Sequence, residues 1–412
     1  MTYDLVVIGA GAGGCFASIR LAECMPGASV CVLESARKPL SKVEISGGGR
    51  CNVTHACFDP KELATYYPRG SRELLGSFHR FQPADMVQWL EDKGVRLKTE
   101  ADGRMFPVSD SSQTIIDCFL SAMKKLKVEL RTSTRANRWT QQENGSWEIE
   151  LFDGSILSSK YLLIASGSDK RTWDNLRESG HQIIPPVPSL FTFNIKDKKL
   201  NALLGVSKAE VVVTLPKFSF TTSGPLLITH WGLSGPAILK LSAWAARELY
   251  DANYVFDAVI NWLGDDDDEA VALYLKNGIA TQGKKQVDNL PLTGFPARLW
   301  KYLCQRAGLP GQLTFGEMSK QYTASLHQVL LRDTYRVTGK STFKEEFVTA
   351  GGIDLKDIDM RRFESKVTPG LFIVGEALNI DALTGGFNFQ AAWTGSELAA
   401  QAIAEKISTS ER

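Results

Sequence analysis

A run of glycines near the start of the chain has a spacing that can bind phosphate. Residues 9–14, with the sequence GAGAGG, fit the pattern G-x-G-x-x-G. In this pattern the first glycine permits a tight turn, the second lets a pyrophosphate approach the backbone, and the third allows a helix to pack closely on a strand. The amides at the start of that helix bind phosphate oxygens. The pattern therefore predicts a dinucleotide site, provided that a strand precedes it and a helix follows.

The segments around these glycines complete the pattern. Residues 4–8 are apolar, residues 15–23 have the character of a helix, and residues 30–33 are a second apolar run that ends at Glu34. A strand, a glycine turn, a helix and a strand within about 30 residues form the smallest unit of a parallel sheet. An acid at the end of the second strand binds the ribose hydroxyls of adenosine and disfavours a 2′-phosphate. We therefore expect FAD or NAD at this site, and not NADP.

The C-terminal part of the chain favours FAD over NAD. Residues 368–376 read as an apolar strand that ends in Gly-Glu, and in flavoproteins built from both chain ends such a strand carries an acid to the ribityl hydroxyls. A Gly-Gly pair then leads into a helix at 391–405, whose N-terminus can stabilise negative charge on a reduced flavin. Residues 161–167 form a third strand with a small-residue turn at its end. Each piece alone also fits a tight turn that needs small residues only for packing.

Residues 46–52, with the sequence SGGGRCN, are the most distinctive stretch. Three consecutive glycines lose much backbone entropy on folding, so a simple surface loop seldom keeps them. They permit close contact with a flat ring or a pyrophosphate, and Lys42 and Arg50 can supply positive charge. Cys51 and Cys57 either form a redox pair or are small buried residues.

Side chains that could act as acid or base are few, and the catalytic residue stays unknown. His230 either stabilises a turn or faces the flavin from an inserted domain. His55 lies just after the glycine stretch. Arg50 either offsets charge on a reduced flavin, binds an anionic substrate or contacts the pyrophosphate. The acidic run 265–269 fits a helix N-terminus better than a metal site, because no calcium-loop spacing follows.

Composition limits the class of protein. The 412 residues allow two or three domains, and 47 basic against 46 acidic residues leave a net charge of +1, which does not indicate a nucleic-acid binder. No apolar run is long enough to span a membrane. Seven cysteines without a CxxC pair suit a reducing compartment, so we expect a cytoplasmic protein. The oligomeric state stays open.

The order of the elements predicts an α/β fold in which both chain ends form one Rossmann-like FAD-binding domain, with a β-rich domain and a small helical domain inserted. Three prolines at 185–188 cannot continue a helix or a central strand and suggest a boundary. We expect the first part of the FAD-binding domain at 1–188, the β-rich insert at 189–264, a helical segment at 265–340 that returns to the β-rich domain, and the second part at 341–412.

Four blocks of sequence resemble a known family. They are GAGAGG at 9–14, SGGGRCNVT at 46–54, LITHWGLSGP at 227–236, and a long block at 348–397 that contains VGEALNIDALTGGFNFQAAWTG. The chain resembles bacterial NAD(P)/FAD-dependent oxidoreductases, a family that includes bile-acid C=C reductases, aminoacetone-oxidase-like flavoproteins and a ribosomal RNA dihydrouridine synthase. It departs from them after Gly167, where a glycine-rich loop is shortened, so the resemblance does not identify the substrate.

The resemblance implies tightly bound FAD, with NADH or NADPH as a transient donor, and a flavin that transfers hydride at N5. The substrate would be a small molecule with a conjugated C=C bond, an amine or an alcohol; the alternatives are uridine in ribosomal RNA and flavin binding without turnover. It also implies that Ala136 meets adenine through its backbone. The residues that we expect at the cofactor, from the motifs and the resemblance together, are Gly9, Gly11, Gly13, Gly14, Glu34, Lys42, Ser46, Gly47, Gly48, Gly49, Arg50, Cys51, Asn52, Ala136, Ala165, Ser166, Gly167, Gly375, Glu376, Asp381, Gly385, Gly386, Asn388 and Phe389.

Overall fold

The computed structural model describes residues 2–264, 268–341 and 348–410. Most of the predicted acidic run 265–269 lies outside these ranges. The chain divides into two compact units. Unit 1 comprises Met1–Val187 and Lys344–Arg412, and unit 2 comprises Pro188–Phe343.

A nine-stranded sheet forms the centre of unit 1. Its strand β1 (Thr2–Ile8) is parallel to β2 (Val30–Leu33) on one side and to β9 (Ile156–Ile164) on the other. β20 (Leu371–Ile373) from the C-terminal part pairs in parallel with β9, so both ends of the chain contribute to one sheet. The remaining strands are β6 (Glu129–Arg131), β7 (Ala136–Gln141), β8 (Trp147–Leu151), β18 (Ile358–Asp359) and β19 (Glu364–Ser365).

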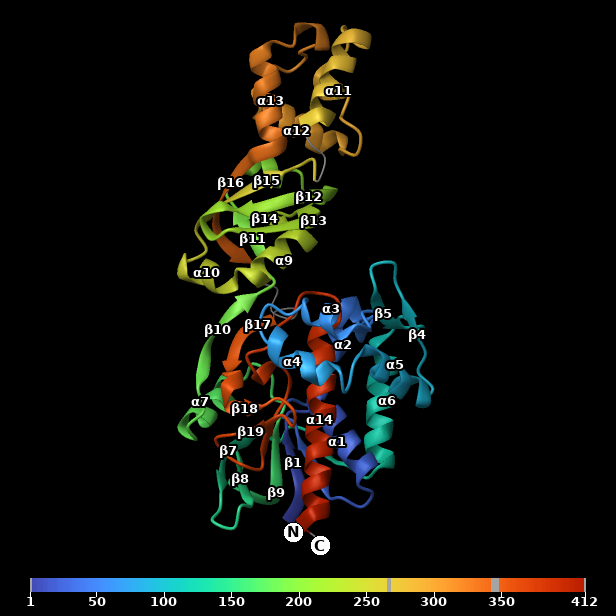
Figure 1. The fold of residues 1–412 in the computed structure, drawn as a ribbon, viewed down its shortest axis with the longest axis vertical. Coiled ribbons are helices and arrows are strands. Elements are labelled where there is room, and N and C mark those ends of the chain that lie inside the picture. Colours follow the sequence, from blue (N-terminus) through green and yellow to red (C-terminus); the bar gives the residue numbers. More distant parts are fainter. Residues whose placement is uncertain (1, 265–267, 342–347, 411–412) are drawn as a thin grey trace. The chain divides into compact units, whose positions relative to one another are not determined.

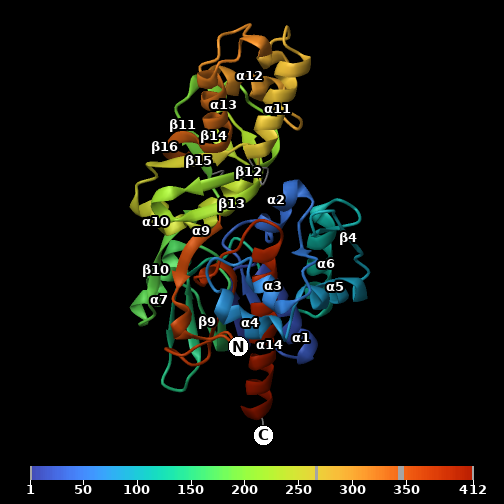
Figure 2. The same cartoon turned by 45° about the horizontal axis from the view of Figure 1, so that its top comes forward.

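Helices α1 (Ala12–Cys24) and α14 (Phe387–Ser410) pack side by side on this sheet, as Figures 1 and 2 both show. The contact is close because Gly13 faces α14: the Ser396 hydroxyl donates to the Gly13 carbonyl at 2.9 Å. The other helices of unit 1 are α2 (Ser41–Gly49), α3 (Pro60–Ala64), α4 (Ser71–Phe78), α5 (Pro83–Asp92), α6 (Ser112–Lys125) and α7 (Lys170–Glu178).

Two small sheets complete unit 1. β3 (Thr54–His55), β5 (Arg104–Pro107) and β4 (Leu97–Thr99) form an antiparallel sheet in the order β3-β5-β4. Among the described residues, β10 (Ile183–Ser189) pairs with β17 (Val348–Ile353) alone. The three prolines therefore lie in a strand with one neighbour, where a missing backbone N–H can point away from the ladder.

Unit 2 contains a closed six-stranded barrel in the order β11-β14-β13-β12-β15-β16. Helices α11 (Asp268–Thr281), α12 (Ala297–Arg306) and α13 (Lys320–Arg332) form a cluster beside β15 and β16 (Figure 1). The barrel strands are β11 (Thr192–Ile195), β12 (Ser207–Leu215), β13 (Phe220–Ile228), β14 (Gly232–Ser234), β15 (Phe256–Asn261) and β16 (Asp333–Ser341), and the remaining helices are α8 (Lys198–Asn201), α9 (Pro236–Trp244) and α10 (Ala246–Asp251).

The predicted fold class is confirmed. A sheet built from both chain ends carries an inserted barrel with helices. Also present are the predicted strands at 4–8 and 30–33 and the predicted helix that follows the glycine turn. Within the described residues, no helix is both long and apolar enough to cross a bilayer.

Candidate functional site

The glycine turn between β1 and α1 combines close packing with open space. Gly9 has φ +104°, and a Cβ there would lie 2.6 Å from the Ala165 carbonyl oxygen. A Cβ on Gly14 would collide with the Gly9 carbonyl. Gly11, by contrast, has no atom within 4 Å of its Cβ position. Two glycines therefore serve packing, and the third leaves room beside the start of α1.

The N-terminus of α1 has no side chain that satisfies its free amides. Gly11 is the N-cap and offers no side-chain hydrogen bond, and the first turn contains no acidic residue. The first amides of a helix need partners and carry a partial positive charge. An incoming phosphate can therefore accept their hydrogen bonds beside the open face of Gly11.

Glu34 is held at the end of β2 by the glycine turn itself. Its carboxylate accepts a hydrogen bond from the Ala10 amide at 2.9 Å and another from the Ala36 amide at 2.8 Å. The Thr134 amide donates to the Glu34 carbonyl at 2.8 Å, which brings the segment just before Ala136 alongside. The expected ribose and adenine contacts therefore lie next to each other.

Glu376 connects three expected site segments that are far apart in the sequence. Its carboxylate forms an ion pair with Lys42 and accepts a hydrogen bond from the Thr349 amide at 3.1 Å. A Cβ on Gly167 would lie 3.6 Å from the same carboxylate. The Lys42 ammonium is therefore already paired with a carboxylate, while 57% of the Lys42 side chain is exposed. Its contact with a pyrophosphate stays a prediction.

The stretch 46–52 follows the helical part of α2, a helix that the sequence did not reveal; from Ser46 to Gly48 the backbone is not helical. Gly47, Gly48 and Gly49 have φ values of +57°, +68° and +81°, and Cys51 has φ +59°. No atom lies within 4 Å of a Cβ placed on Gly48 or Gly49. These two glycines present an open backbone surface, whereas Cys51 is fully buried and shapes the loop.

Asn52 joins this loop to the start of α14. With its amide oriented so that both groups are satisfied, the side chain donates to the Thr54 carbonyl and accepts from the Gly386 amide, each at 3.0 Å. A Cβ on Gly386 would lie 2.7 Å from the Thr54 backbone, and the Thr54 hydroxyl donates to Gln390 at 2.7 Å. The two Gly-rich segments therefore form one continuous structure.

Residues before and inside the first turn of α14 stabilise that turn. The Asn388 side chain accepts from the Ala382 amide at 3.0 Å and donates to the Ala382 carbonyl at 3.1 Å. Asp381 was expected at the cofactor, but it is fully buried and both of its carboxylate oxygens bind Arg69. A residue with no exposed surface cannot touch a ligand, so Asp381 supports the loop from inside.

The two cysteines that could have formed a redox pair are free thiols. Burial raises the pKa of Cys51 to about 12 and that of Cys57 to about 11. Both thiols are therefore protonated at neutral pH, and a thiol is a much weaker nucleophile than a thiolate. This geometry favours the interpretation of both as small buried residues.

His55 lies in a stack of rings at the start of α14. Its ring is 4.6 Å from that of Phe387, which is 4.2 Å from that of Tyr66. Nε2 donates to the Asp102 carbonyl at 3.0 Å, and Nδ1 has no hydrogen-bond partner in the part of the chain that the structure describes. Burial lowers the pKa of His55, so the ring is neutral at pH 7.

Because folding lowers the pKa of His55, the free energy of unfolding should depend on pH. An unfolded chain binds a proton at an ordinary histidine pKa of about 6.5, whereas the folded chain binds it only at lower pH. The free energy of unfolding should therefore decrease as the pH drops below about 6.5. In urea titrations across this range, His55→Gln should flatten the decrease.

His181 adds to the slope in that experiment, because burial lowers its pKa as well. A His55→Gln profile as steep as that of the unchanged protein would show that His55 titrates normally in the fold.

His230 lies in unit 2, on the exposed turn between β13 and β14. The Thr229 amide donates to the Gly232 carbonyl at 2.8 Å, which closes the turn without the histidine. The expectation that His230 faces a ligand stays a prediction.

Several residues that organise the site carry no recognisable motif. Arg69, Phe106 and Glu100 lie between the predicted blocks and could be identified only from their contacts. Gln390 could have been noticed, because a buried polar side chain in the first turn of α14 needs a partner.

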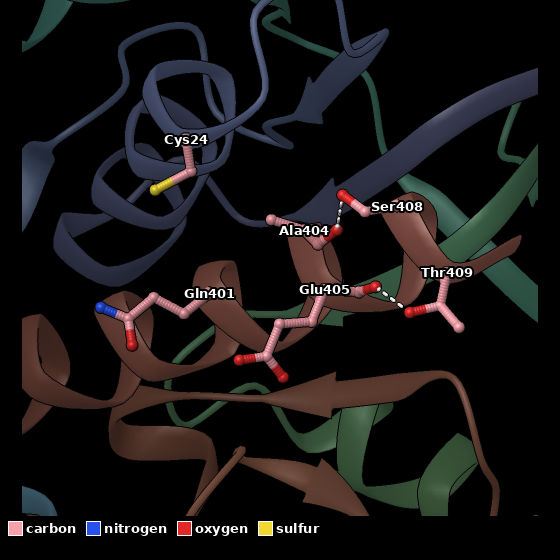
Figure 3. Close-up of a pocket in the computed structure, with 6 residues that line it drawn as sticks. All are labelled: Cys24, Gln401, Ala404, Glu405, Ser408 and Thr409. Carbon is pink, nitrogen blue, oxygen red and sulfur yellow. Dashed lines mark hydrogen bonds between the residues drawn. The ribbon is translucent and has the colours of Figure 1, made fainter. Parts of the chain in front are cut away.

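A shallow, open groove in the described residues lies away from this site (Figure 3). It has a volume of about 470 Å³ and is lined by Cys24, Gln401, Ala404, Glu405, Ser408 and Thr409. The two hydroxyls bond back to carbonyls of their own helix. At 1.5 Å per residue, the groove lies roughly 20–30 Å along α14 from the Gly-rich turn.

Among the residues that the structure describes, no group of three or more His, Cys, Asp or Glu could hold a metal ion. The donors that are present suit a different ligand. Free helix amides suit a pyrophosphate, a carboxylate at the end of β2 suits a ribose, and open glycines suit a flat ring. The residues present therefore fit a dinucleotide.

Comparisons with known proteins agree with this fit. The family model described as "HI0933-like protein Rossmann domain" matches residues 3–402. The ribosomal RNA dihydrouridine synthase of Escherichia coli is 27% identical, with 97% of each chain covered. The 3-dehydro-bile acid delta(4,6)-reductase of Clostridium scindens is 25% identical over 97% of this chain and 98% of its own.

Among solved structures, a 3-ketosteroid-delta4-(5alpha)-dehydrogenase from Rhodococcus jostii RHA1 has a TM-score of 0.53 with 13% identity, over 98% of this chain and 97% of its own. At this identity the likeness concerns the fold alone.

Proposed function

The chain belongs to the HI0933-like Rossmann family, the group of FAD-dependent oxidoreductases that its sequence resembles. From this premise we propose that it reduces a conjugated C=C bond of a small molecule with electrons from NADH or NADPH. FAD would be held in unit 1 and would supply hydride transfer through its N5. The alternative substrate class is an amine or an alcohol, which would give electrons to the flavin instead of accepting them.

One observation carries the proposal. Segments from residues 9–14, 34, 46–49, 167 and 376–388 converge in unit 1, and the glycines with open Cβ positions lie among them. The start of α1 and Gly11 would bind the pyrophosphate, and Glu34 would bind the adenosine ribose. Glu376 would face the ribityl chain, and Gly48 and Gly49 would lie against the ring.

The start of α14 would orient the ring end of the cofactor. Its first turn contains no acidic residue, and Gly385 and Gly386 precede it, so its free amides favour an acceptor or an anion there. Neutral His55 is fixed through Asp102 and Phe387, so it adds no positive charge to this region at pH 7.

The nicotinamide donor would bind only transiently, because the sequence contains no second G-x-G-x-x-G motif. The purified protein should be yellow and should release FAD on denaturation. Anaerobic NADH or NADPH should bleach the flavin absorbance. A flavin that neither donor bleaches would contradict the NAD(P)H linkage and indicate reduction by the substrate. A colourless protein that cannot be reconstituted would contradict FAD binding.

A second candidate substrate is uridine in RNA. The similarity to a ribosomal RNA dihydrouridine synthase covers 97% of both chains, and the C5=C6 bond of uracil is conjugated with a carbonyl. The reduced protein should then be reoxidised by RNA with formation of dihydrouridine, and RNA binding should weaken steeply with salt. Reoxidation by small enones alone would favour the first candidate.

A further inference from the structure

The SGGGRCN loop has a backbone conformation that needs external support. Four of its residues, Gly47, Gly48, Gly49 and Cys51, are left-handed. The glycines lose much entropy when they are ordered, and a left-handed non-glycine residue is strained by about 1–3 kcal/mol. Within the loop, the Cys51 amide donates to the Ser46 carbonyl at 3.0 Å. One backbone hydrogen bond within the loop does little against this cost.

Arg50 connects the loop to the hairpin formed by β4 and β5. Its guanidinium lies 2.6 Å from Glu100 and 3.6 Å from Asp110. The same group stacks 4.0 Å above the centre of the Phe106 ring. Its Nε donates to the Gly47 carbonyl at 3.4 Å, so one side chain contacts both the loop and the hairpin.

Phe106 makes the second connection. The ring is fully buried, and its Cε1 would lie 2.8 Å from a Cβ placed on Gly47. The loop therefore rests on the ring at Gly47 and is held over it by Arg50. Gly48 and Gly49, which have open Cβ positions, lie between these two anchors.

The acids that bind Arg50 are themselves fixed. Glu100 also binds Arg104 at 2.9 Å, and Asp110 also binds Lys98. Arg104 also forms an ion pair with Asp102 at 2.8 Å. The connected network therefore contains three cations and three acids. The charge of Arg50 is compensated inside this network, so a reduced flavin would gain little from it.

We propose that Arg50 is a positioning residue: it clamps the glycine loop to Glu100 and Phe106 so that the backbone of Gly48 and Gly49 is held ready for a flat ligand, and it is not the charge partner of that ligand. The inference rests on the proposed function for the identity of the ligand. The clamp itself consists only of contacts within the protein.

Hydrogen exchange tests the clamp without any cofactor. Arg50→Ala should speed exchange of the amides of residues 48–51 at least about tenfold, because their local opening becomes easier. Arg96→Gln is the matched control: it removes an exposed cation directly before β4 whose side chain, among the described residues, forms no ion pair with Glu100 or Asp110, so the exchange should stay unchanged. Unchanged exchange in Arg50→Ala would overturn the proposal. If Arg50→Ala does not fold, Glu100→Gln serves as the milder variant and should speed exchange of the same amides.

Flavin titration separates positioning from charge. If Arg50 positions the loop, Arg50→Lys should weaken FAD binding about as much as Arg50→Ala does, which is at least about tenfold. Lysine keeps the charge but lacks the planar guanidinium that pairs with Glu100 and stacks on Phe106. Glu100→Gln should weaken binding too, and the double variant should lose less than the two effects added. The midpoint potential of the flavin that remains bound should not change.

A charge partner would give the opposite pattern: Arg50→Lys would retain FAD, Glu100→Gln would not weaken it, and the midpoint potential would shift in Arg50→Ala. That pattern would overturn the proposal. A protein that binds no FAD at all would refute the proposed function, while the exchange experiment would still decide whether the clamp exists.

Discussion

Gly11→Ala should abolish flavin binding and leave the fold intact. Gly11 has φ −81°, which any residue adopts, and an added methyl group would meet no atom within 4 Å. The same methyl group would stand where a pyrophosphate must approach the amides at the start of α1. We expect FAD to bind at least about 100-fold more weakly, a loss of about 2.7 kcal/mol in binding free energy.

The measurement is a fluorescence titration of FAD into the protein freed of flavin, with thermal unfolding of the same sample. Gly14→Ala is the matched comparison, because its methyl group would collide with the Gly9 carbonyl. That variant should lose stability as well as flavin. Full flavin binding by Gly11→Ala would mean that no pyrophosphate lies at this turn.

Arg69→Ala should destabilise the protein by about 3–5 kcal/mol, because it would leave the Asp381 carboxylate buried without its main partner. The Asp381 side chain has no exposed surface, and that of Arg69 is 15% exposed. Their backbones also form an isolated bridge, which ties the loop before α14 to the segment that leads into α4. Urea denaturation at pH 7 would measure the change.

An exposed ion pair provides the control for this experiment. Arg138 and Glu178 are 64% and 65% exposed at 3.4 Å, so Arg138→Ala should change the free energy of unfolding by less than about 1 kcal/mol. If Arg69→Ala were equally mild, the buried pair would not stabilise the loop. Because that loop carries Gly385 and Gly386, we also expect Arg69→Ala to lose flavin at temperatures where it is still folded.

Much of the fold could be predicted from local patterns. The first βαβ unit and the long C-terminal helix both appear. Each depends on residues close in sequence: a glycine turn between two apolar runs, or a helical period. Helix α2 was not recognised because it is short and runs directly into the glycine stretch.

The roles of the charged residues could not be predicted in the same way. Lys42 and Arg50 were expected to supply charge to a ligand, and the fold pairs them with Glu376 and Glu100. Asp381 was expected at the cofactor and is buried against Arg69. In each case the partner lies in another segment, and nothing in the motif indicates it.

The sequence by itself determined that the chain has a dinucleotide-type glycine turn, an acid after the second strand and a fold built from both ends. These features follow from residue type and short-range spacing, because the backbone geometry of glycine and the alternation of apolar runs act locally. Only the tertiary structure decided which glycines face open space and which charges are already satisfied. The partners of Arg50, Arg69 and Lys42 lie 50, 312 and 334 residues away. The contacts of Arg69 and Lys42 exist only once the sheet has brought the two ends of the chain together, and that of Arg50 only once the hairpin of β4 and β5 lies beside the glycine loop.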